Sequence, residues 1–244
     1  MARFFGLIGY PLSHSFSKRY FADKFLRENI TQNSYELYPL SAISELPQLL
    51  QENPLLEGLN VTIPYKEQVL SYLDEMSPVV QETGACNCIR ITDGILKGYN
   101  TDVLGFEQTL SRKLSTHHKK ALVLGTGGAA KAVHYVLKQK SISFIQVGRQ
   151  KREDVIDYET LTPELMAEHT LIINTTPLGM YPNVDEAPAI PYGCLGDNHY
   201  LYDLVYNPAK TLFLKRGEEK GAVTENGADM LVIQAEASWD IWNS

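Results

Sequence analysis

Hydrophobic residues occur in two patterns that alternate from one end of the chain to the other. Short apolar runs predict buried strands, whereas apolar residues at three- and four-residue intervals predict amphipathic helices. In the first hundred residues the short runs fall near 3–8, 34–39 and 58–62, and the periodic stretches fall near 18–28, 43–51 and 66–73. Alternating strands and helices are typical of parallel sheets covered by helices, so we expect an α/β fold.

The stretch from 88 to 124 predicts a hairpin followed by the start of a second unit. Asp93-Gly94 separates the runs 88–91 and 95–99 and favours a tight turn, and we place this hairpin at a sheet edge. Thr101 and Asp102 can cap the next helix, which leads through the basic segment 115–120 into a strand at 121–124. We therefore expect two α/β domains. The apolar stripe of the connecting helix comprises Val103, Leu104, Phe106, Leu110 and Leu114.

Composition narrows the class of protein. The 244 residues are 44% hydrophobic and 21% charged, as in ordinary soluble globular proteins, and the length accommodates one large or two modest domains. The formal net charge of -7 argues against a surface built for nucleic acid or an anionic membrane. The apolar run at 4–9 is too short for a membrane helix, and Pro11 follows too closely for a signal peptide. We expect a cytoplasmic protein in which this run is a buried strand.

The cysteines and histidines predict neither disulfides nor a metal. The chain has three cysteines, and Cys86 and Cys88 are one residue apart, which fits neither a disulfide framework nor a usual zinc spacing. We expect reduced thiols. None of the six histidines falls in an HExxH or similar pattern, so no metal site is expected.

A lone lysine and one acidic residue form the first candidate for catalytic chemistry. Lys66 closes the segment GLNVTIPYK at 58–66, just after a predicted strand-to-helix corner, and Asp102 closes GYNTD at 98–102. Together they suffice to move a proton at a hydroxyl or carbonyl. An ordinary lysine pKa near 10.4 is high for a base; the start of a helix disfavours the cation and a nearby carboxylate favours it. A solvated lysine and a helix cap are the alternative interpretation, and spacing alone does not decide between them.

The segment GTGGAA at 125–130 predicts a dinucleotide site. It follows a strand directly and opens a helix whose inner face comprises Ala130, Val133, Val136 and Leu137. Glycines let the backbone approach a pyrophosphate, and the helix N-terminus attracts its charge. Tight turn geometry alone is the alternative. The residues expected at the cofactor are Gly125, Thr126, Gly127, Gly128, Ala129 and Ala130.

The next strand is expected at 143–147, and the residues at its end indicate which dinucleotide binds. NAD-selective sites place an acidic side chain there for the ribose 2′-hydroxyl, whereas a 2′-phosphate needs cations. Here the tip is basic, so we expect NADP, with Arg149 as the main contact and Gln150, Lys151 and Arg152 as helpers. A solvated basic turn is the alternative interpretation.

The motifs together resemble the shikimate and quinate dehydrogenase family almost end to end. The family patterns are matched by GYPLSHSFS at 9–17, NVTIPYK at 60–66, GACN at 84–87, GYNTD at 98–102, NTTPLGM at 174–180 and DLVYNP at 203–208. Thr211, Gly227, Met230, Leu231 and Gln234 complete the match. The resemblance implies reversible NADPH-dependent reduction of 3-dehydroshikimate to shikimate, a step in chorismate and aromatic amino acid biosynthesis.

The resemblance also assigns roles to individual residues. Ser15 and Ser17 would hold the substrate carboxylate, although 13–17 taken alone reads as a turn and helix cap. Lys66 would be the acid/base and Asp102 its orienting partner. The expected contacts with the substrate hydroxyls are Thr62, Lys66, Asn87, Asp102 and Gln234, with Tyr206 near the nicotinamide unless it is core packing. The motifs of the second domain add Asn174, Thr175, Thr176, Met180, Val205 and Gly227 at the cofactor.

Residues 1–102 and 228–244 would form the substrate domain, because Gln234 must return to the substrate, and 103–227 the NADP domain, with a cleft between them. The expected partner is a small-molecule substrate, in a monomer or homodimer. Two departures stand out: Cys88 replaces a usual threonine, and 149–174 is shorter than is common. A quinate/shikimate dehydrogenase that prefers NAD and a non-catalytic ligand-sensing module are the rival interpretations.

Overall fold

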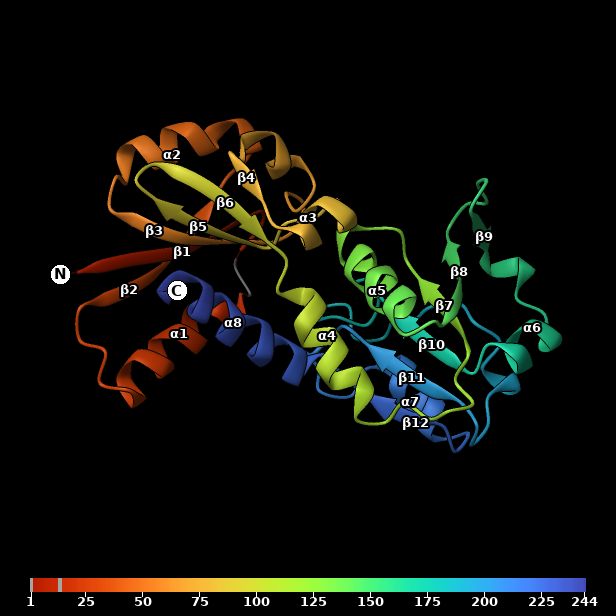
Figure 1. Ribbon diagram of the computed structural model, residues 1–244. Helices are drawn as coiled ribbons and strands as arrows, with labels where there is room; N and C mark the ends of the chain where they lie inside the picture. The colour runs from red at the N-terminus through yellow and green to blue at the C-terminus, as the bar shows by residue number, and fades with distance from the viewer. Residues whose placement is uncertain (1, 13–14) are drawn as a thin grey trace. The chain divides into compact units, whose positions relative to one another are not determined.

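The computed structural model describes residues 2–12 and 15–244 and divides into two compact units (Figure 1). The first comprises Met1–Thr101 with Gln234–Ser244, and the second comprises Asp102–Ile233. The sequence-based boundaries lay after residues 102 and 227. Contacts divide the chain after Thr101 and Ile233, so the last helix, α8 (Ala228–Asn243), contributes residues to both units.

The first unit is built on a six-stranded mixed sheet in the order β2-β1-β3-β5-β6-β4. Strand β1 pairs in parallel with β2 and β3, whereas β5 runs antiparallel to both β3 and β6. The strands are β1 (Arg3–Gly9), β2 (Asn33–Pro39), β3 (Leu56–Val61), β4 (Glu75–Met76), β5 (Cys88–Thr92) and β6 (Ile95–Tyr99).

Helices cover both faces of this sheet, as Figure 1 shows. On one face, α1 and α8 enclose an aromatic core in which Phe5 stacks on Trp242 and Phe21 stacks on Tyr35, each with ring centroids less than 5 Å apart. On the other face, α2 and α3 cover Ile8, Leu59 and Ile89. The helical segments are α1 (Phe16–Arg27), α2 (Leu46–Glu52), α3 (Pro78–Thr83) and the 3-10 turns η1 (Ile43–Glu45) and η2 (Gln68–Tyr72).

Two expectations for the first unit are corrected. The hairpin turn at Asp93-Gly94 is confirmed, but β5 and β6 are inner strands, because the two-residue strand β4 pairs with the outer side of β6. The helix expected at 66–73 is a 3-10 turn that begins only at Gln68. It ends early because Asp74 exchanges hydrogen bonds with the backbone N–H and carbonyl of Leu96, which draws the chain into the sheet.

The second unit is a six-stranded, fully parallel sheet in the order β12-β11-β10-β7-β8-β9. Chain order runs outward in both directions from the adjacent strands β7 and β10, so the winding reverses between them. The strands are β7 (Lys120–Leu124), β8 (Ser143–Gly148), β9 (Val155–Asp157), β10 (Leu171–Asn174), β11 (Tyr200–Asp203) and β12 (Val223–Glu225).

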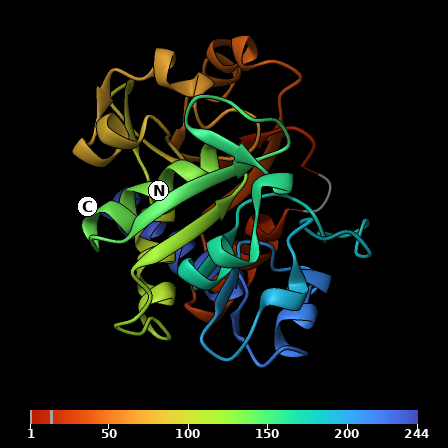
Figure 2. The same cartoon turned by 90° about the vertical axis from the view of Figure 1, so that its right-hand side faces the viewer.

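Helices cover both faces of the second sheet (Figures 1 and 2). The inner face predicted for α5 is confirmed, since Ala130, Val133, Val136 and Leu137 are all buried. The predicted stripe of α4 is only partly right, because Leu104 is 41% exposed and Leu114 lies beyond the helix end. The helical segments are α4 (Asp102–Ser111), α5 (Gly128–Gln139), α6 (Pro163–Glu168), α7 (Leu212–Glu218) and the 3-10 turns η3 (Tyr158–Thr160) and η4 (Tyr192–Cys194).

His134 makes the stability of the second unit depend on pH. Its ring stacks on Phe144 at 4.4 Å, and burial lowers the pKa of His134 to about 4. Between about pH 6.5 and pH 4, His134 is protonated in the unfolded chain but stays neutral in the folded chain. The free energy of unfolding therefore falls as the pH drops from about 6.5 toward 4. His134→Phe keeps the stacking but cannot be protonated. From pH 7 to pH 5, we expect its free energy of unfolding to decrease by about 1 kcal/mol less than that of the parent. Urea unfolding at both pH values measures this; equal losses in the two proteins would contradict it.

Candidate functional site

The segment that carries Lys66 is fixed by its backbone. Strand β3 ends at Val61, and Thr62 then donates its N–H to the carbonyl of Ile8 at 2.9 Å. Tyr65 is buried, and its hydroxyl donates to the carbonyl of Leu40 at 2.5 Å. The carbonyl of Lys66 accepts the N–H of Cys86 at 2.8 Å. These bonds fix the half-buried Lys66 in a turn after β3, beside the segment that leads to Asn87.

Asn87 is the best-connected of the predicted site residues. Its side chain is buried, and its amide N–H donates to the Thr101 hydroxyl at 3.0 Å, while its amide oxygen accepts the backbone N–H of Thr101 at 2.7 Å. The second amide N–H reaches Gln234 Oε1 at 3.4 Å. Asn87 and Gln234 are 147 residues apart in the chain, and the structure brings their side chains together, in keeping with the shared substrate contact that the resemblance implied.

Asp102 begins α4 and is buried. The bonds between Thr101 and Asn87 fix the backbone immediately before it. By contacts, Asp102 belongs to the second unit and Lys66 to the first, so their pairing stays a prediction. Because Lys66 precedes the 3-10 turn η2, the argument that a helix start disfavours its cation no longer applies.

The opening motif serves partly as a helix cap. Ser13 and His14 lie outside the described residues. Ser15 is the N-cap of α1, and its hydroxyl oxygen accepts the N–H of Ser17 at 3.3 Å, so the cap interpretation is right. A cap uses only a lone pair, which leaves the hydroxyl hydrogen as a donor for a carboxylate. Burial raises the pKa of Tyr35 well above its ordinary value, while a hydrogen bond with the Ser17 side chain acts against this.

Three residues at this site escaped the sequence analysis as functional candidates. Asn60 is buried and accepts the Tyr35 hydroxyl at 2.8 Å while donating to Ser238 at 2.9 Å. Asn60 lies within a quoted motif, and Ser238 lies one helical turn after Gln234 on α8. Those positions are the signals that could have found them. Tyr35 carries no such signal, because it is one aromatic residue in an ordinary strand.

The departure at Cys88 lies in the core. Its thiol is buried, burial raises its pKa, and it hydrogen-bonds the side chain of Ser238. Cys86 is also buried, and both cysteines are free thiols. A buried thiol of raised pKa is unreactive, so Cys88 contributes packing here.

The glycine loop of the second unit lies where the winding of the sheet reverses. Gly125 follows β7 with φ of 116°, a conformation that favours glycine, and an added Cβ would meet Thr175 Oγ1 at 2.5 Å. Thr175 follows β10 and donates its hydroxyl to the carbonyl of Leu124 at 2.8 Å. Strands β7 and β10 are the pair between which chain order reverses, and open α/β sheets bind ligands at the carboxyl ends of such strands.

The start of α5 fits a dinucleotide pyrophosphate. Gly127 is the N-cap and makes no side-chain capping bond, and the first turn holds no acidic residue. A Cβ added at Gly127 would meet nothing within 4 Å, so the space in front of the helix is open. Backbone N–H groups at such a helix start attract phosphate. Thr126 and Gly127 are exposed, Gly125, Gly128 and Ala129 are half-buried, and Ala130 is buried against the sheet.

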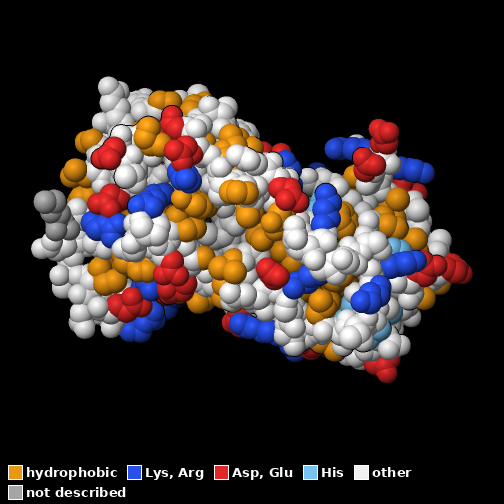
Figure 3. All heavy atoms as spheres, in the orientation of Figure 1, with side chains coloured by type: hydrophobic (Ala, Val, Ile, Leu, Met, Phe, Trp, Pro, Cys, Tyr) orange, Lys and Arg blue, Asp and Glu red, His pale blue; other side chains and the backbone are white. Residues whose placement is uncertain are grey.

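The residues expected to bind the 2′-phosphate after β8 all reach solvent. Arg149, Gln150, Lys151 and Arg152 are exposed, and the backbone of Arg152 pairs with Val155. The loop also carries two exposed acids, Glu153 and Asp154. The projecting loop at the upper right of Figure 3 accordingly shows blue and red side chains together. The charge available to a 2′-phosphate is therefore local to Arg149 and its neighbours.

A buried carboxylate ties together the loops that follow β10 and β11. Asp203 accepts the Asn174 amide at 2.9 Å, the N–H of Val205 at 3.0 Å and the Thr211 hydroxyl at 2.6 Å. Burial raises the pKa of Asp203 to about 6. The Asn174 oxygen accepts both the N–H and the hydroxyl of Thr176. The side chain of Asn174 thus shapes the expected cofactor loop from within.

The remaining residues expected at the cofactor border these loops. Met180 is 42% exposed, and Tyr206 is half-buried. Gly227 donates its N–H to the carbonyl of Val205 at 3.2 Å. An added methyl at Gly227 would collide with the carbonyl of Leu204, so this glycine permits close backbone packing.

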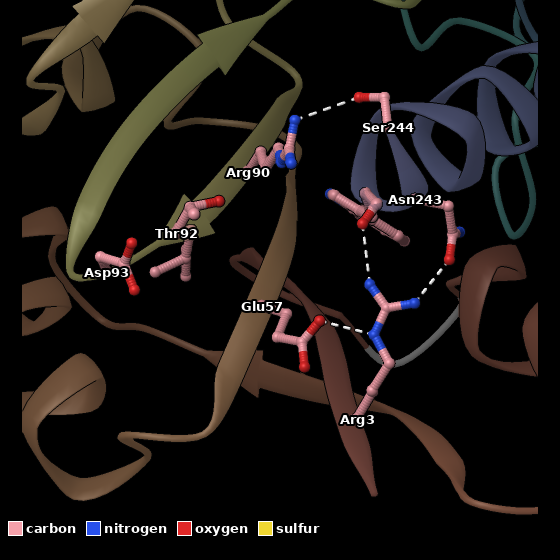
Figure 4. A pocket seen from close by; sticks show the side chains of 9 residues that line it. Arg3, Glu57, Arg90, Thr92, Asp93, Asn243 and Ser244 are labelled. Atoms are coloured by element: carbon pink, nitrogen blue, oxygen red, sulfur yellow. Dashed lines mark hydrogen bonds and ion pairs between the residues drawn. The ribbon is translucent and has the colours of Figure 1, made fainter. Parts of the chain in front are cut away.

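A separate cavity of about 460 Å³ lies in the first unit and is not the candidate site (Figure 4). It borders the start of β1 and the β5–β6 turn, whereas Lys66 and Asn87 lie near the opposite ends of the strands. The guanidinium of Arg3 is already bound to Glu57 at 2.5 Å, to Asn243 at 2.5 Å and to the carbonyl of Trp242 at 2.7 Å. The Arg3 guanidinium is therefore already used by contacts within the fold.

Residues 2–12 and 15–244 contain neither a metal-binding cluster nor a membrane helix. Within those residues no group of three or more His, Cys, Asp or Glu side chains is placed to hold a metal ion. In the same part of the chain, no helix has the length and apolar character needed to cross a membrane.

The winding of the second unit, with its glycine loop at the point of reversal, is that of dinucleotide-binding dehydrogenases. The chain is an oxidoreductase of this class. More particularly, it belongs to the shikimate dehydrogenase family, and the expected family and α/β fold are confirmed.

Three comparisons carry this assignment beside the family model described as shikimate dehydrogenase substrate binding domain, which matches residues 7–89. Shikimate dehydrogenase (NADP(+)) of Clostridium beijerinckii is 37% identical over 249 residues, covering 98% of this chain and 91% of the relative. The structure of shikimate dehydrogenase 1 from Peptoclostridium difficile is 38% identical with a TM-score of 0.88, covering 99% of this chain and 91% of that one. Shikimate 5-dehydrogenase from Thermus thermophilus, solved with NADP(H) and shikimate, is 29% identical with a TM-score of 0.86, covering 98% of this chain and 93% of that one.

Proposed function

We propose that this protein is an NADP-dependent shikimate dehydrogenase, which reversibly reduces 3-dehydroshikimate to shikimate in the synthesis of chorismate and aromatic amino acids. The observation that carries the proposal is family membership over nearly the whole chain, with a relative named for this activity at 37% identity. The geometry supports it, because the glycine loop fits a dinucleotide and the first unit holds the amides that a polyhydroxylated ring requires.

The proposed division of labour follows the two units. NADP(H), when bound, gives or accepts the hydride. Lys66 Nζ gives or removes the proton at the reacting oxygen, and the Asp102 carboxylate orients it. The hydroxyls of Ser15 and Ser17 hold the substrate carboxylate, and Thr62 donates to a ring hydroxyl. Tyr206 lies beside the nicotinamide in this proposal.

Asn87 and Gln234 are proposed to grip a ring hydroxyl between them. Four hydrogen-bonding positions of the Asn87 amide are filled by Thr101 and Gln234, and the contact with Gln234 at 3.4 Å is the longest. A hydroxyl that accepts from Asn87 and donates to Gln234 replaces this long bond by two shorter ones.

Cofactor binding is proposed for the glycine loop and the loops after β8, β10 and β11. The N–H groups from Gly127 onward receive the pyrophosphate, and the guanidinium of Arg149 receives the 2′-phosphate. Thr175, Thr176 and Met180 border the cofactor on the β10 side. Asp203 holds these loops in place.

A spectrophotometric assay tests the proposed function. The purified protein is given shikimate or quinate with NADP⁺ or NAD⁺, and absorbance of the reduced cofactor is followed. We expect shikimate with NADP⁺ to give the highest kcat/KM. Higher kcat/KM with quinate and NAD⁺ would favour the NAD-preferring relative, and turnover with none of the four pairs would favour a ligand-sensing module.

A further inference from the structure

We propose that Tyr35 and Ser238 are positioning residues for the substrate, and that both act through the amide of Asn60. All three belong to the first unit and are buried, and none contacts the reacting atoms in this proposal. The inference rests on the proposed function, since shikimate binding is its readout. It extends the candidate site to a strand, β2, in which no motif falls.

The Asn60 amide makes three hydrogen bonds to three different segments. Its oxygen accepts the Tyr35 hydroxyl of β2 at 2.8 Å. Its NH₂ group donates to Ser238 of α8 at 2.9 Å and to the backbone carbonyl of Asn87 at 3.2 Å. Asn60 therefore joins β2, α8 and the segment that leads into β5 at one buried point.

The chemistry of these partners permits only one orientation of the amide. Ser238 has a single hydroxyl hydrogen, which it donates to the backbone carbonyl of Gln234 at 2.9 Å, so it must accept at its contact with Asn60. The carbonyl of Asn87 also can only accept. If the Asn60 amide were flipped, its oxygen would face the carbonyl oxygen of Asn87, and two acceptors cannot form a hydrogen bond. The NH₂ group therefore faces Ser238, the amide oxygen faces Tyr35, and the Tyr35 hydroxyl must donate.

This orientation sets the spacing of the two amides proposed to bind substrate. Asn60 binds the backbone of Asn87 directly and the backbone of Gln234 through Ser238. The side chains of Asn87 and Gln234 face each other at 3.4 Å. A rotated or loosened Asn60 amide would shift one partner relative to the other. Since hydrogen bonds weaken steeply with distance and angle, substrate affinity is expected to suffer before turnover does.

Removal of one hydroxyl tests the inference. Tyr35→Phe keeps the ring that stacks on Phe21 but leaves the Asn60 oxygen without its donor. It also removes the hydrogen bond between Tyr35 and Ser17, so a route through Asn60 requires the same direction of change in Ser238→Ala, which leaves Ser17 untouched. An unpaired buried acceptor is costly, so we expect the Kd for shikimate to rise about tenfold, with kcat within about threefold and the KM for NADP⁺ unchanged. Calorimetry gives Kd, and steady-state kinetics gives the rest.

Tyr202→Phe is the matched control. Tyr202 is also fully buried, and its hydroxyl hydrogen-bonds the side chain of Thr109 at 2.6 Å within the second unit. It loses the same group and a comparable bond, so its melting temperature should fall while its shikimate Kd stays that of the parent. An equal rise of Kd in both variants would overturn the inference, because general destabilisation would then explain it.

Ser238→Ala provides an independent arm if Tyr35→Phe folds poorly. It removes the acceptor that orients Asn60, so the Kd for shikimate should rise about fivefold or more. In the double variant the Kd should rise by less than the product of the two single effects, because both substitutions act on one amide. A Kd within twofold of the parent in folded Ser238→Ala and in folded Tyr35→Phe would refute the inference. Turnover of the parent protein tests the proposed function separately.

Discussion

Replacing Lys66 with alanine is expected to lower kcat for shikimate oxidation by two or more orders of magnitude, while shikimate affinity changes comparatively little. Loss of a positioned acid/base typically costs about 10²–10⁴ in rate. The backbone should not move, because it is held by the carbonyl bond to Cys86 and by the buried ring of Tyr65. Steady-state kinetics with NADP⁺ and calorimetry with shikimate separate the two quantities.

Lys97→Ala is a suitable control for this variant. Lys97 lies in the same unit, is partly exposed and pairs with Glu75 at 2.7 Å, and ion pairs that reach solvent contribute little. Its kcat should equal that of the parent. Near-normal turnover in Lys66→Ala would remove Lys66 from the role of acid/base and return it to the interpretation as a solvated lysine.

Replacing Arg149 with aspartate is expected to erase the preference for NADP⁺ over NAD⁺. The change removes the guanidinium proposed to hold the 2′-phosphate and adds a carboxylate that repels it and accepts the ribose 2′-hydroxyl of NAD⁺. We expect the ratio of kcat/KM for NADP⁺ to that for NAD⁺ to fall by about two orders of magnitude, roughly 2.7 kcal/mol of discrimination. Initial rates with each cofactor at saturating shikimate give the ratio.

Lys220→Asp is the control for the charge change. It makes the same change of two units of charge at an exposed site in the second unit, after α7 and away from the tip of β8. An unchanged cofactor ratio in Arg149→Asp, or the same fall in Lys220→Asp, would contradict the assignment. Glu153 and Asp154 already contribute negative charge to the same loop, so the preference depends on where Arg149 is placed more than on the net charge of the loop.

The parts of the fold that local chemistry determines could be predicted from sequence. A glycine loop between a buried strand and an amphipathic helix identifies itself, and Ala130 and Val133 are buried as the periodicity requires. The Asp93-Gly94 turn is equally local. The edge position of its hairpin was wrong because β4 has only two residues, too few to leave a pattern.

The limits of prediction lie in contacts between distant segments. The end of the helix expected at 66–73 depends on the hydrogen bonds of Asp74 with Leu96, a strand residue that the helix's own sequence does not specify. The contact between Asn60 and Ser238 joins residues 178 positions apart, and no local period refers to it. Asn87 and Gln234 were both expected at the substrate only because the family resemblance supplied the missing distance information.

The first unit is built from two segments that are far apart in the chain, which affects the order of folding during synthesis. Trp239 and Trp242 of α8 pack against Phe5, and Trp242 also lies 5.6 Å from Phe21, so part of the aromatic core arrives about two hundred residues after the rest. The second unit needs nothing beyond Ile233. Although domains generally fold in order of synthesis, this order is expected to be inverted here. Until the last helix has emerged, this face of the sheet in the nascent N-terminal segment has only α1 to cover it.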